Sequence, residues 1–189
     1  MSTPLSGFYR DRHRARSHSY RQRTAHAHRN PAEDGFACKH CSLYVSSASL
    51  LSGVQNRNHC PYCLWSRHLD LYAPGDRLSA CKALMRPVGL TVKTTRKKYG
   101  PGRGELMLIH LCAECEQLSI NRIAADDDSQ RVFGVYTDSL RLENSMQTRL
   151  EADGIRTLGA SDRDAVCAQL FGRVTESTEV FFRGELESA

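Results

Sequence analysis

The sequence has no long hydrophobic run, and its beginning lacks the apolar segment of a secretory signal peptide. No stretch approaches the roughly 20 apolar residues that a membrane-spanning helix needs. These absences argue against a membrane protein and favour a reducing, cytoplasmic location. In such a compartment, close cysteine pairs hold metal more often than they form disulfides.

Several enzyme motifs are also missing. The sequence contains no Gly-rich phosphate loop, no serine nucleophile elbow and no His-x-Glu with a downstream Pro-Cys-x-x-Cys of a zinc deaminase. One enzymatic alternative stays open, a zinc-supported nuclease of the His-Asn type. Asn58, His59, His68 and the acidic run 126–128 could supply its base and metal ligands. The sequence therefore favours a binding role over catalysis.

Acidic residues are nearly absent from residues 1–32, which carry seven Arg and one Asp and so have a net charge of +6. The whole chain has a net charge of +5, so the rest of it has a net charge of −1. With so few apolar side chains, residues 1–33 are predicted to be a disordered basic arm. The arm could solubilise the protein, bind a polyanion such as RNA, or serve as a transit peptide. A zinc-binding domain is expected over residues 34–130, followed by a helical C-terminal extension over 131–189.

Eight cysteines are present, and four of them form the pairs Cys38-x2-Cys41 and Cys60-x2-Cys63, eighteen residues apart. Each pair makes a tight knuckle that directs two thiolates at one point, and two knuckles complete the tetrahedral shell that Zn²⁺ prefers. Such a closed shell predicts a structural rather than a catalytic ion. The alternative is redox chemistry, because Cys60-Pro61-Tyr62-Cys63 matches the glutaredoxin tetrapeptide. No βαβ pattern surrounds it, which favours zinc.

A second zinc site is predicted from Cys81, Cys112 and Cys115. The fourth ligand is ambiguous. His110 is the predicted ligand because it is close in sequence and shares a strand face with Cys112, while His68 is the rival and His59 a weaker candidate. Alternatively, Cys81 is a buried apolar residue and no second ion binds. Cys167 is predicted to lie in the middle of a helix and to fill the hydrophobic core.

The predicted elements place these ligands in an α+β fold. A helix is expected over 64–71, and a hairpin is expected from alternating strands at 90–94 and 105–112. Near the C-terminus, one helix is expected from about residue 137 through Leu150, and another through Val166 and Leu170 to Gly172. The class is a small zinc-ribbon-like domain with two Cys-rich zinc sites.

The predicted tip of that hairpin is rich in cations and carries one aromatic residue. Phosphates would contact the cations and the tyrosine could stack on an exposed base. The predicted nucleic-acid contacts are Lys93, Arg96, Lys97, Lys98, Tyr99 and Arg103. A charged tip can also be merely solvated.

The motifs together resemble the RNHCP domain family over about residues 36–128. Arg57-Asn58-His59-Cys60-Pro61 spells the family's name. Further matching segments are Phe36-x-Cys38-x2-Cys41, 63–70, 74–77, Cys81, Met85, Pro87, His110-x-Cys112-x2-Cys115 and 121–127. The resemblance implies a compact bacterial or archaeal zinc-binding domain without an established activity. Glu116 departs from the glycine expected after the last knuckle, where a left-handed turn is needed.

Polar residues crowd the segment after the family motif. Their simplest role is to support the metal sites: Asn58 and Asp76 would satisfy turn amides, and Asp70 would pair with Arg77. We therefore expect a module with two structural zinc ions that binds RNA or a ribonucleoprotein. A zinc-dependent protein-interaction or regulatory module is the alternative, ahead of a nuclease.

Overall fold

The computed structural model describes residues 35–93 and 104–172, so the predicted basic arm and hairpin tip lie outside it. The described chain begins with a small antiparallel sheet of β1 (Gly35–Ala37) and β2 (Tyr44–Ser46). A short helix, α1 (Ser49–Ser52), follows it. The first knuckle lies in the turn between β1 and β2.

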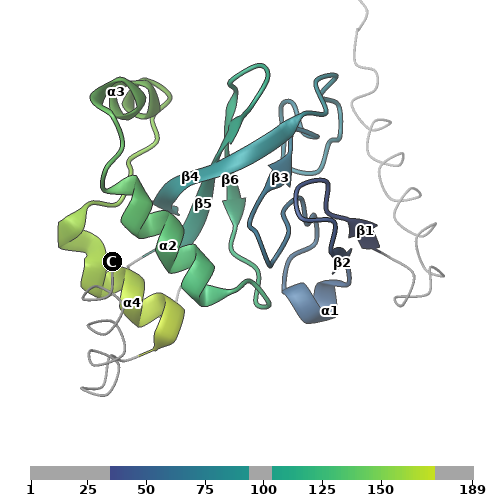
Figure 1. Cartoon of the computed structure of the whole chain (residues 1–189), viewed down its shortest axis with the longest axis horizontal. Coiled ribbons are helices and arrows are strands. Elements are labelled where there is room, and N and C mark those ends of the chain that lie inside the picture. Colours follow the sequence, from purple (N-terminus) through teal and green to yellow (C-terminus); the bar gives the residue numbers. More distant parts are fainter. Residues whose placement is uncertain (1–34, 94–103, 173–189) are drawn as a thin grey trace, which may run out of the picture. The chain divides into compact units, whose positions relative to one another are not determined.

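A second, four-stranded antiparallel sheet has the order β3-β4-β5-β6 (Figure 1). The strands are β3 (Ser66–Arg67), β4 (Leu84–Lys93), β5 (Glu105–Cys112) and β6 (Leu118–Arg122). Strands β4 and β5 are the predicted hairpin, and their register runs from Met85 opposite Cys112 to Lys93 opposite Glu105. The expected hairpin is confirmed, and with it the α+β class.

The C-terminal helices are α2 (Ser129–Ser139), α3 (Asn144–Ala152) and α4 (Arg163–Phe171), with a 3-10 turn at Ala160–Asp162 before α4. Helix α2 begins where the Asp128 side chain accepts hydrogen bonds from the backbone N–H groups of Gln130 and Arg131. Helix α4 is followed by Gly172, as predicted from the sequence. The single helix expected from residue 137 is wrong, because residues 137–139 end α2 and α3 starts five residues later.

The main core lies between β4, β5 and the helices. Leu90 and Leu108 are fully buried against Val132 and Tyr136 of α2 and Val166 of α4. Tyr136 donates a hydrogen bond to Gly159 O (2.8 Å), and Leu158 N donates to Leu90 O (3.0 Å). The helices of the predicted C-terminal extension thus complete the hydrophobic core that lies against the four-stranded sheet.

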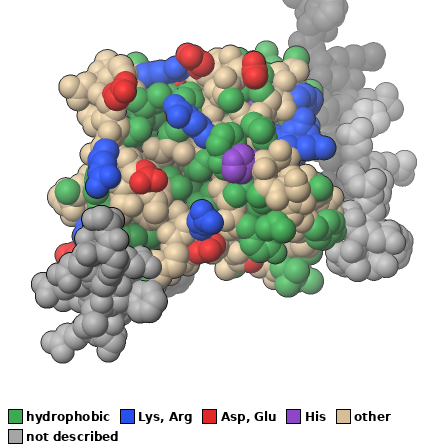
Figure 2. All heavy atoms as spheres, viewed as in Figure 1, with side chains coloured by type: hydrophobic (Ala, Val, Ile, Leu, Met, Phe, Trp, Pro, Cys, Tyr) green, Lys and Arg blue, Asp and Glu red, His purple; other side chains and the backbone are tan. Residues whose placement is uncertain are grey.

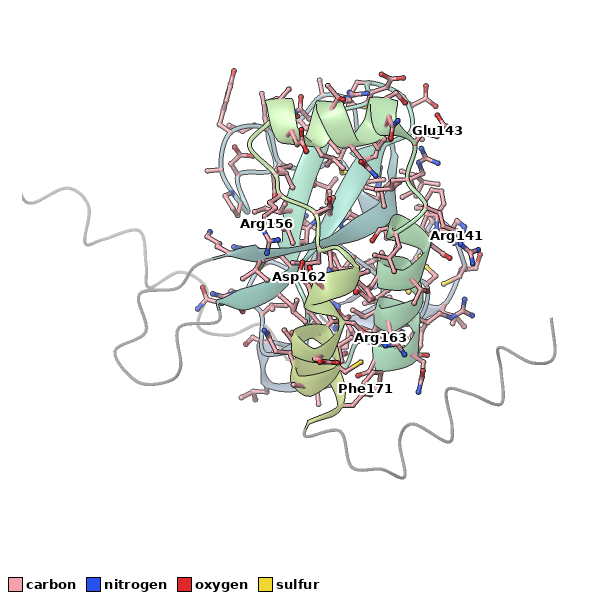
Figure 3. All side chains as sticks on the ribbon, turned by 90° about the vertical axis from the view of Figure 1, so that its left-hand side faces the viewer. Arg141, Glu143, Arg156, Asp162, Arg163 and Phe171 are labelled. Atoms are coloured by element: carbon pink, nitrogen blue, oxygen red, sulfur yellow. The ribbon has the colours of Figure 1, made fainter. Side chains whose placement is uncertain are left out.

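Helix α4 runs beside α2, with Arg163 near its beginning and Phe171 at its end (Figure 3). The Arg163 guanidinium carbon lies 5.4 Å from the centre of the Phe133 ring, and Phe171 meets the same ring edge-on at 5.9 Å. Cys167 is buried in this layer, as expected for a core residue. In the loop before α4, Arg156 and Asp162 form an ion pair (3.3 Å).

The helix expected over residues 64–71 is wrong. Leu64 adopts a left-handed backbone conformation (φ 61°), which stops a helix directly after the second knuckle. The chain instead forms β3, which pairs with β4 through Ser66 opposite Met85. Among the described residues, no helix is long and apolar enough to cross a membrane.

Candidate metal centres

The first group of potential ligands consists of Cys38, Cys41, Cys60 and Cys63, whose sulfur atoms all lie within 4.8 Å of one another. The Cys38–Cys63 and Cys41–Cys60 Sγ distances are both 3.6 Å. A Zn–S bond of about 2.3 Å places tetrahedral sulfurs about 3.8 Å apart, so the group has the dimensions of a ZnS₄ shell. Its donors are consistent with zinc.

The second group consists of His68, Cys81, Cys112 and Cys115. The Cys81 and Cys112 Sγ atoms are 3.6 Å apart, and Cys115 Sγ lies 3.1 Å from His68 Nδ1. Three thiolates and one imidazole form a common zinc shell. Cys81 and Cys115 are exposed, whereas His68 and Cys112 are buried.

His68 reaches this group through strand pairing. Strand β3 pairs with β4, and the ladder continues with His68 N donating to Ala83 O (2.9 Å). On the other side of β4, Met85 lies opposite Cys112. Strand β4 therefore holds the His68 imidazole beside the third knuckle, Cys112-x2-Cys115.

The structure does not bring His110 to the cysteines, so His68 replaces it as the histidine of the second group. His110 is fully buried, where its Nε2–H donates to Leu64 O (2.7 Å) and its Nδ1 accepts from Asn121 Nδ2 (2.9 Å). Burial and the neighbouring His59 lower the pKa of His110 to about 3. A neutral ring with both nitrogens occupied serves as a structural link between the second knuckle and β6.

The thiol pKa values are unequal within each group. Burial alone would raise the pKa of Cys38, but the backbone N–H groups of Cys41 and His40 and the nearby thiols lower it to about 7. In the second group, the backbone N–H groups of Cys115 and Glu114 similarly outweigh burial and lower the pKa of Cys112 to about 6. Burial and the neighbouring thiols raise the pKa of Cys63. One thiolate thus opposes ionisation of the next, and a cation would relieve that repulsion.

A buried network of charged side chains lies next to the second knuckle, which contributes Cys60 and Cys63 to the first group. Arg57 forms ion pairs with Asp126 (2.7 Å) and Asp127 (3.0 Å), and its Nε donates to His59 O. His59 Nε2–H donates to the second oxygen of Asp127 (2.7 Å), which also accepts from Ala124 N. The side chains of Arg57, His59 and Asp127 are almost completely buried. The burial of the His59 side chain, which is 2% exposed, argues against its action as the base of a nuclease.

Of the two predicted turn residues, Asp76 bonds to backbone amides, whereas the Asn58 side chain donates to Asp70 instead. Asp76 accepts hydrogen bonds from the N–H groups of Leu71, Tyr72, Ala73 and Leu78. Asp70 accepts from Gly75 N, Arg77 N and Asn58 Nδ2. Its ion pair with Arg77 is long (3.8 Å). These two carboxylates fix the loop between His68 and Cys81.

The family comparison agrees with this geometry. The RNHCP domain matches residues 33–133, more than half of the chain. The chain belongs to the RNHCP domain family. No significant similarity to a curated protein or to a solved structure was found. The RNHCP match includes both ligand groups and the Arg57–Asp127 network, and it ends inside α2.

Two features of the RNHCP region were not predicted from sequence. The His40 and Trp65 rings are stacked, with centroids 4.2 Å apart and planes 7° apart. A pocket beside the second group lies between residues 69–74 and β6. Position inside a knuckle could have indicated that His40 is exposed, but the stack and the pocket depend on tertiary contacts. Of the predicted nucleic-acid contacts, Lys93 ends β4, and Arg96, Lys97, Lys98, Tyr99 and Arg103 lie outside the described residues.

Proposed function

We propose that this chain is a zinc-stabilised module, with one ion in each ligand group, that binds single-stranded RNA, free or within a ribonucleoprotein. The observation that carries the proposal is the His40–Trp65 ring stack on the first knuckle. His40 is exposed and Trp65 is half-buried beneath it, so the outer ring can extend its stack with an unpaired base.

The surroundings of the stack suit the same ligand. Lys39 next to His40 is exposed, and Tyr62 in the second knuckle is 51% exposed. Single-stranded nucleic acid is bound by such combinations of aromatic faces and cations. Elsewhere in the sequence, seven arginines in residues 1–32 and the cationic segment 93–103 supply further charge for phosphates. We expect the module to act in the cytoplasm, where thiols stay reduced.

Metal analysis tests the first half of the proposal. The full chain, purified without added metal, should contain about two zinc ions, since each group offers four ligands. Strong chelators should unfold it, because structural zinc contributes on the order of 10–16 kcal/mol to folding. A metal-free chain that stays folded and reduces mixed disulfides through Cys60 would support the glutaredoxin alternative.

Binding to an unstructured RNA oligonucleotide, followed by fluorescence anisotropy at several salt concentrations, tests the second half. Log K should fall with log salt by roughly 0.7 per phosphate contact. Deleting residues 1–32 should flatten that slope. His40→Ala should cost about 1–3 kcal/mol of binding without changing the slope, because stacking releases no counterions. His40→Phe keeps a ring and should retain most of the affinity.

A protein-interaction module is the second candidate. Leu50 is 92% exposed and Leu51 62% exposed on α1, with Leu43 half-exposed before β2. Figure 2 shows hydrophobic side chains gathered in this region, at the lower right. Salt-insensitive binding to a protein, lost in Leu50→Ser but not in His40→Ala, with no RNA affinity at low salt, would favour this candidate.

A further inference from the structure

A pocket of about 210 Å³ lies beside the second ligand group. One wall is the loop 69–74 and the other is strand β6, with Met85 and His68 also lining it. Pockets for drug-sized ligands measure roughly 300–1,000 Å³. The smaller volume here suits one heterocyclic ring rather than a larger ligand.

Three amide side chains contribute to the polar lining of this pocket. Asn58, Gln117 and Asn121 line it, together with the Ser119 hydroxyl. An amide offers a donor and an acceptor in one plane, which is the pattern that pairs with the edge of a nucleobase. The Arg67 guanidinium, which also lines the pocket, donates to Lys82 O. Neutral groups and the Asp70 carboxylate suit a heterocycle better than a phosphate.

One polar atom of the lining has no partner. Asn58 Nδ2 donates to Asp70 Oδ2 (2.9 Å), which distinguishes the donor end of the amide from its acceptor end. Asn58 Oδ1 is buried and accepts no hydrogen bond within the described part of the chain. Buried acceptors are normally satisfied, so this oxygen calls for an N–H donor. A ligand with an amino group could supply that donor after a small rotation of the Asn58 side chain.

The rim of the pocket carries an aromatic ring. Tyr72 lines the pocket and is 86% exposed. Its backbone is held in place, since its N–H donates to Asp76 Oδ2 (2.9 Å). A ring on a fixed loop can cover a flat ligand at little entropic cost.

We propose that the pocket between residues 69–74 and β6 binds a single unstacked nucleobase that carries an amino group, held by the edge contacts of Asn58 and Gln117 and covered by Tyr72. This inference rests on the proposed RNA function and gives it a base preference. Adenine, cytosine and guanine present an exocyclic amino group, whereas uracil presents only its ring N3–H between two carbonyl oxygens, which the Asp70 carboxylate beside Asn58 disfavours.

The experiment uses the full zinc-loaded chain and two kinds of probe. Homopolymeric oligoadenylate, oligocytidylate and oligouridylate report affinity in the RNA context. The free nucleosides, titrated against the ¹⁵N-labelled protein, report pocket occupancy through the side-chain amide resonances of Asn58 and Gln117. We expect oligouridylate to bind most weakly, and adenosine or cytidine but not uridine to shift those resonances.

Two variants and a control locate the effect. Tyr72→Ala and Gln117→Met alter exposed side chains, so both should fold. Each should weaken binding of the amino-bearing homopolymers, Tyr72→Ala by roughly 5- to 100-fold, and leave oligouridylate little changed. Leu78→Ala removes a side chain that is 63% exposed in the same region but does not line the pocket, and it should have no effect.

The outcomes separate the two proposals. RNA binding with equal affinity for all homopolymers, unchanged in Tyr72→Ala, would overturn the pocket inference and leave the proposed function standing. Absence of any RNA binding at low salt would overturn the proposed function. In that case the nucleoside titration decides alone: unshifted amide resonances overturn the pocket inference, and a shift that uridine fails to produce upholds base binding.

Discussion

His68 and His110 are both buried, and their ring nitrogens have different partners. His68 directly follows β3 and His110 lies on β5, with β4 between these two strands. His68 Nδ1 faces a cysteine sulfur, whereas both nitrogens of His110 have hydrogen-bond partners in β6 and after the second knuckle. His110 was the predicted ligand because its spacing from Cys112 along one strand can be read from the sequence. The strand pairing that brings His68 to the cysteines cannot be read from it. The six knuckle cysteines of the two groups were predictable because knuckle spacing is local, whereas Cys81 belongs to no knuckle.

The ligand assignment leads to the first prediction. His68→Ala should lower the zinc content of the purified protein from two ions to about one, because three thiolates leave a tetrahedral shell open. His110→Gln, which keeps a donor for Leu64 O, should retain two ions. Metal analysis after dialysis measures both. The reverse pattern, with one ion lost only in His110→Gln, would contradict the assignment.

The backbone conformation of the residue after each knuckle is also predictable. Ser42, Leu64 and Glu116 all have φ near 60°, so the left-handed turn expected at Glu116 is present without the glycine. Such a conformation costs a non-glycine residue roughly 1–2 kcal/mol. Arg149 partly compensates at Glu116, where it pairs with the carboxylate (2.9 Å).

The second prediction follows from Ser42. Ser42→Gly should stabilise the protein by up to about 1 kcal/mol, because relief of the left-handed strain exceeds the added entropy of the unfolded chain. Urea unfolding of the zinc-loaded protein measures it. Ser46→Gly, in strand β2, should instead destabilise. Equal losses in both variants would show that the turn carries no strain.

Among the elements, the loop between His68 and Cys81 is held by carboxylates rather than by a hydrophobic core. Four backbone N–H groups, beginning with that of Leu71, hold the pKa of Asp76 well below its usual range. Backbone bonds and Asn58 similarly outweigh burial and lower the pKa of Asp70. Because two ionised carboxylates hold this loop, its order depends on pH. The same loop lines the proposed base pocket, so the shape of the pocket depends on pH as well.

The third prediction concerns that pH dependence. A depressed pKa means that the folded loop disfavours the protonated carboxyl, so its contribution is complete above the ordinary Asp pKa of about 4 and is lost as pH falls below it. NMR titration of the Asp76 carboxyl should give a pKa below that value. Asp76→Asn should speed amide exchange at Tyr72 and Ala73 already at neutral pH. A normal Asp76 pKa would contradict the prediction.

The elements differ in how far sequence could define them. The β4–β5 hairpin shows strict alternation and was predicted, whereas the turn at Leu64 broke the helix expected over 64–71. Helix α2 was missed at its start because its N-cap, Asp128, lies in an acidic run that also suggested metal ligands. Local periodicity cannot distinguish these roles, and tertiary contacts decide them.

At the scale of the whole molecule, the Arg57–Asp127 network joins the second knuckle to the start of α2. Breaking a buried ion pair leaves a charge without compensation. The fourth prediction is that Asp127→Ala lowers the free energy of unfolding by about 3–5 kcal/mol in urea. Arg156→Ala removes an exposed pair and should cost no more than about 1 kcal/mol. Similar costs for both would argue against a structural network.

The RNHCP match ends at residue 133, yet the core continues beyond it. Tyr136, Leu158 and Val166 are buried against the sheet, and each such side chain contributes about 1.5–3 kcal/mol. The fifth prediction is that a chain ending after residue 134 loses cooperative unfolding and binds a hydrophobic dye, since most domains are stable by only about 5–15 kcal/mol. Unchanged cooperative unfolding of the shortened chain would contradict it.

The pairing of Met85 with Cys112 also has a consequence for the order of assembly. The first ligand group gathers residues from two neighbouring knuckles, and both can form before any long-range strand pairing. The second gathers residues from the segment just after β3, the segment before β4, and the end of β5 with the turn that follows it. These residues meet only when β4 lies between β3 and β5. During synthesis, the first group could therefore take up an ion while the hairpin is still incomplete. The second group is complete only with Cys115, its last residue to emerge, and an ion bound there would lock the register of the finished sheet.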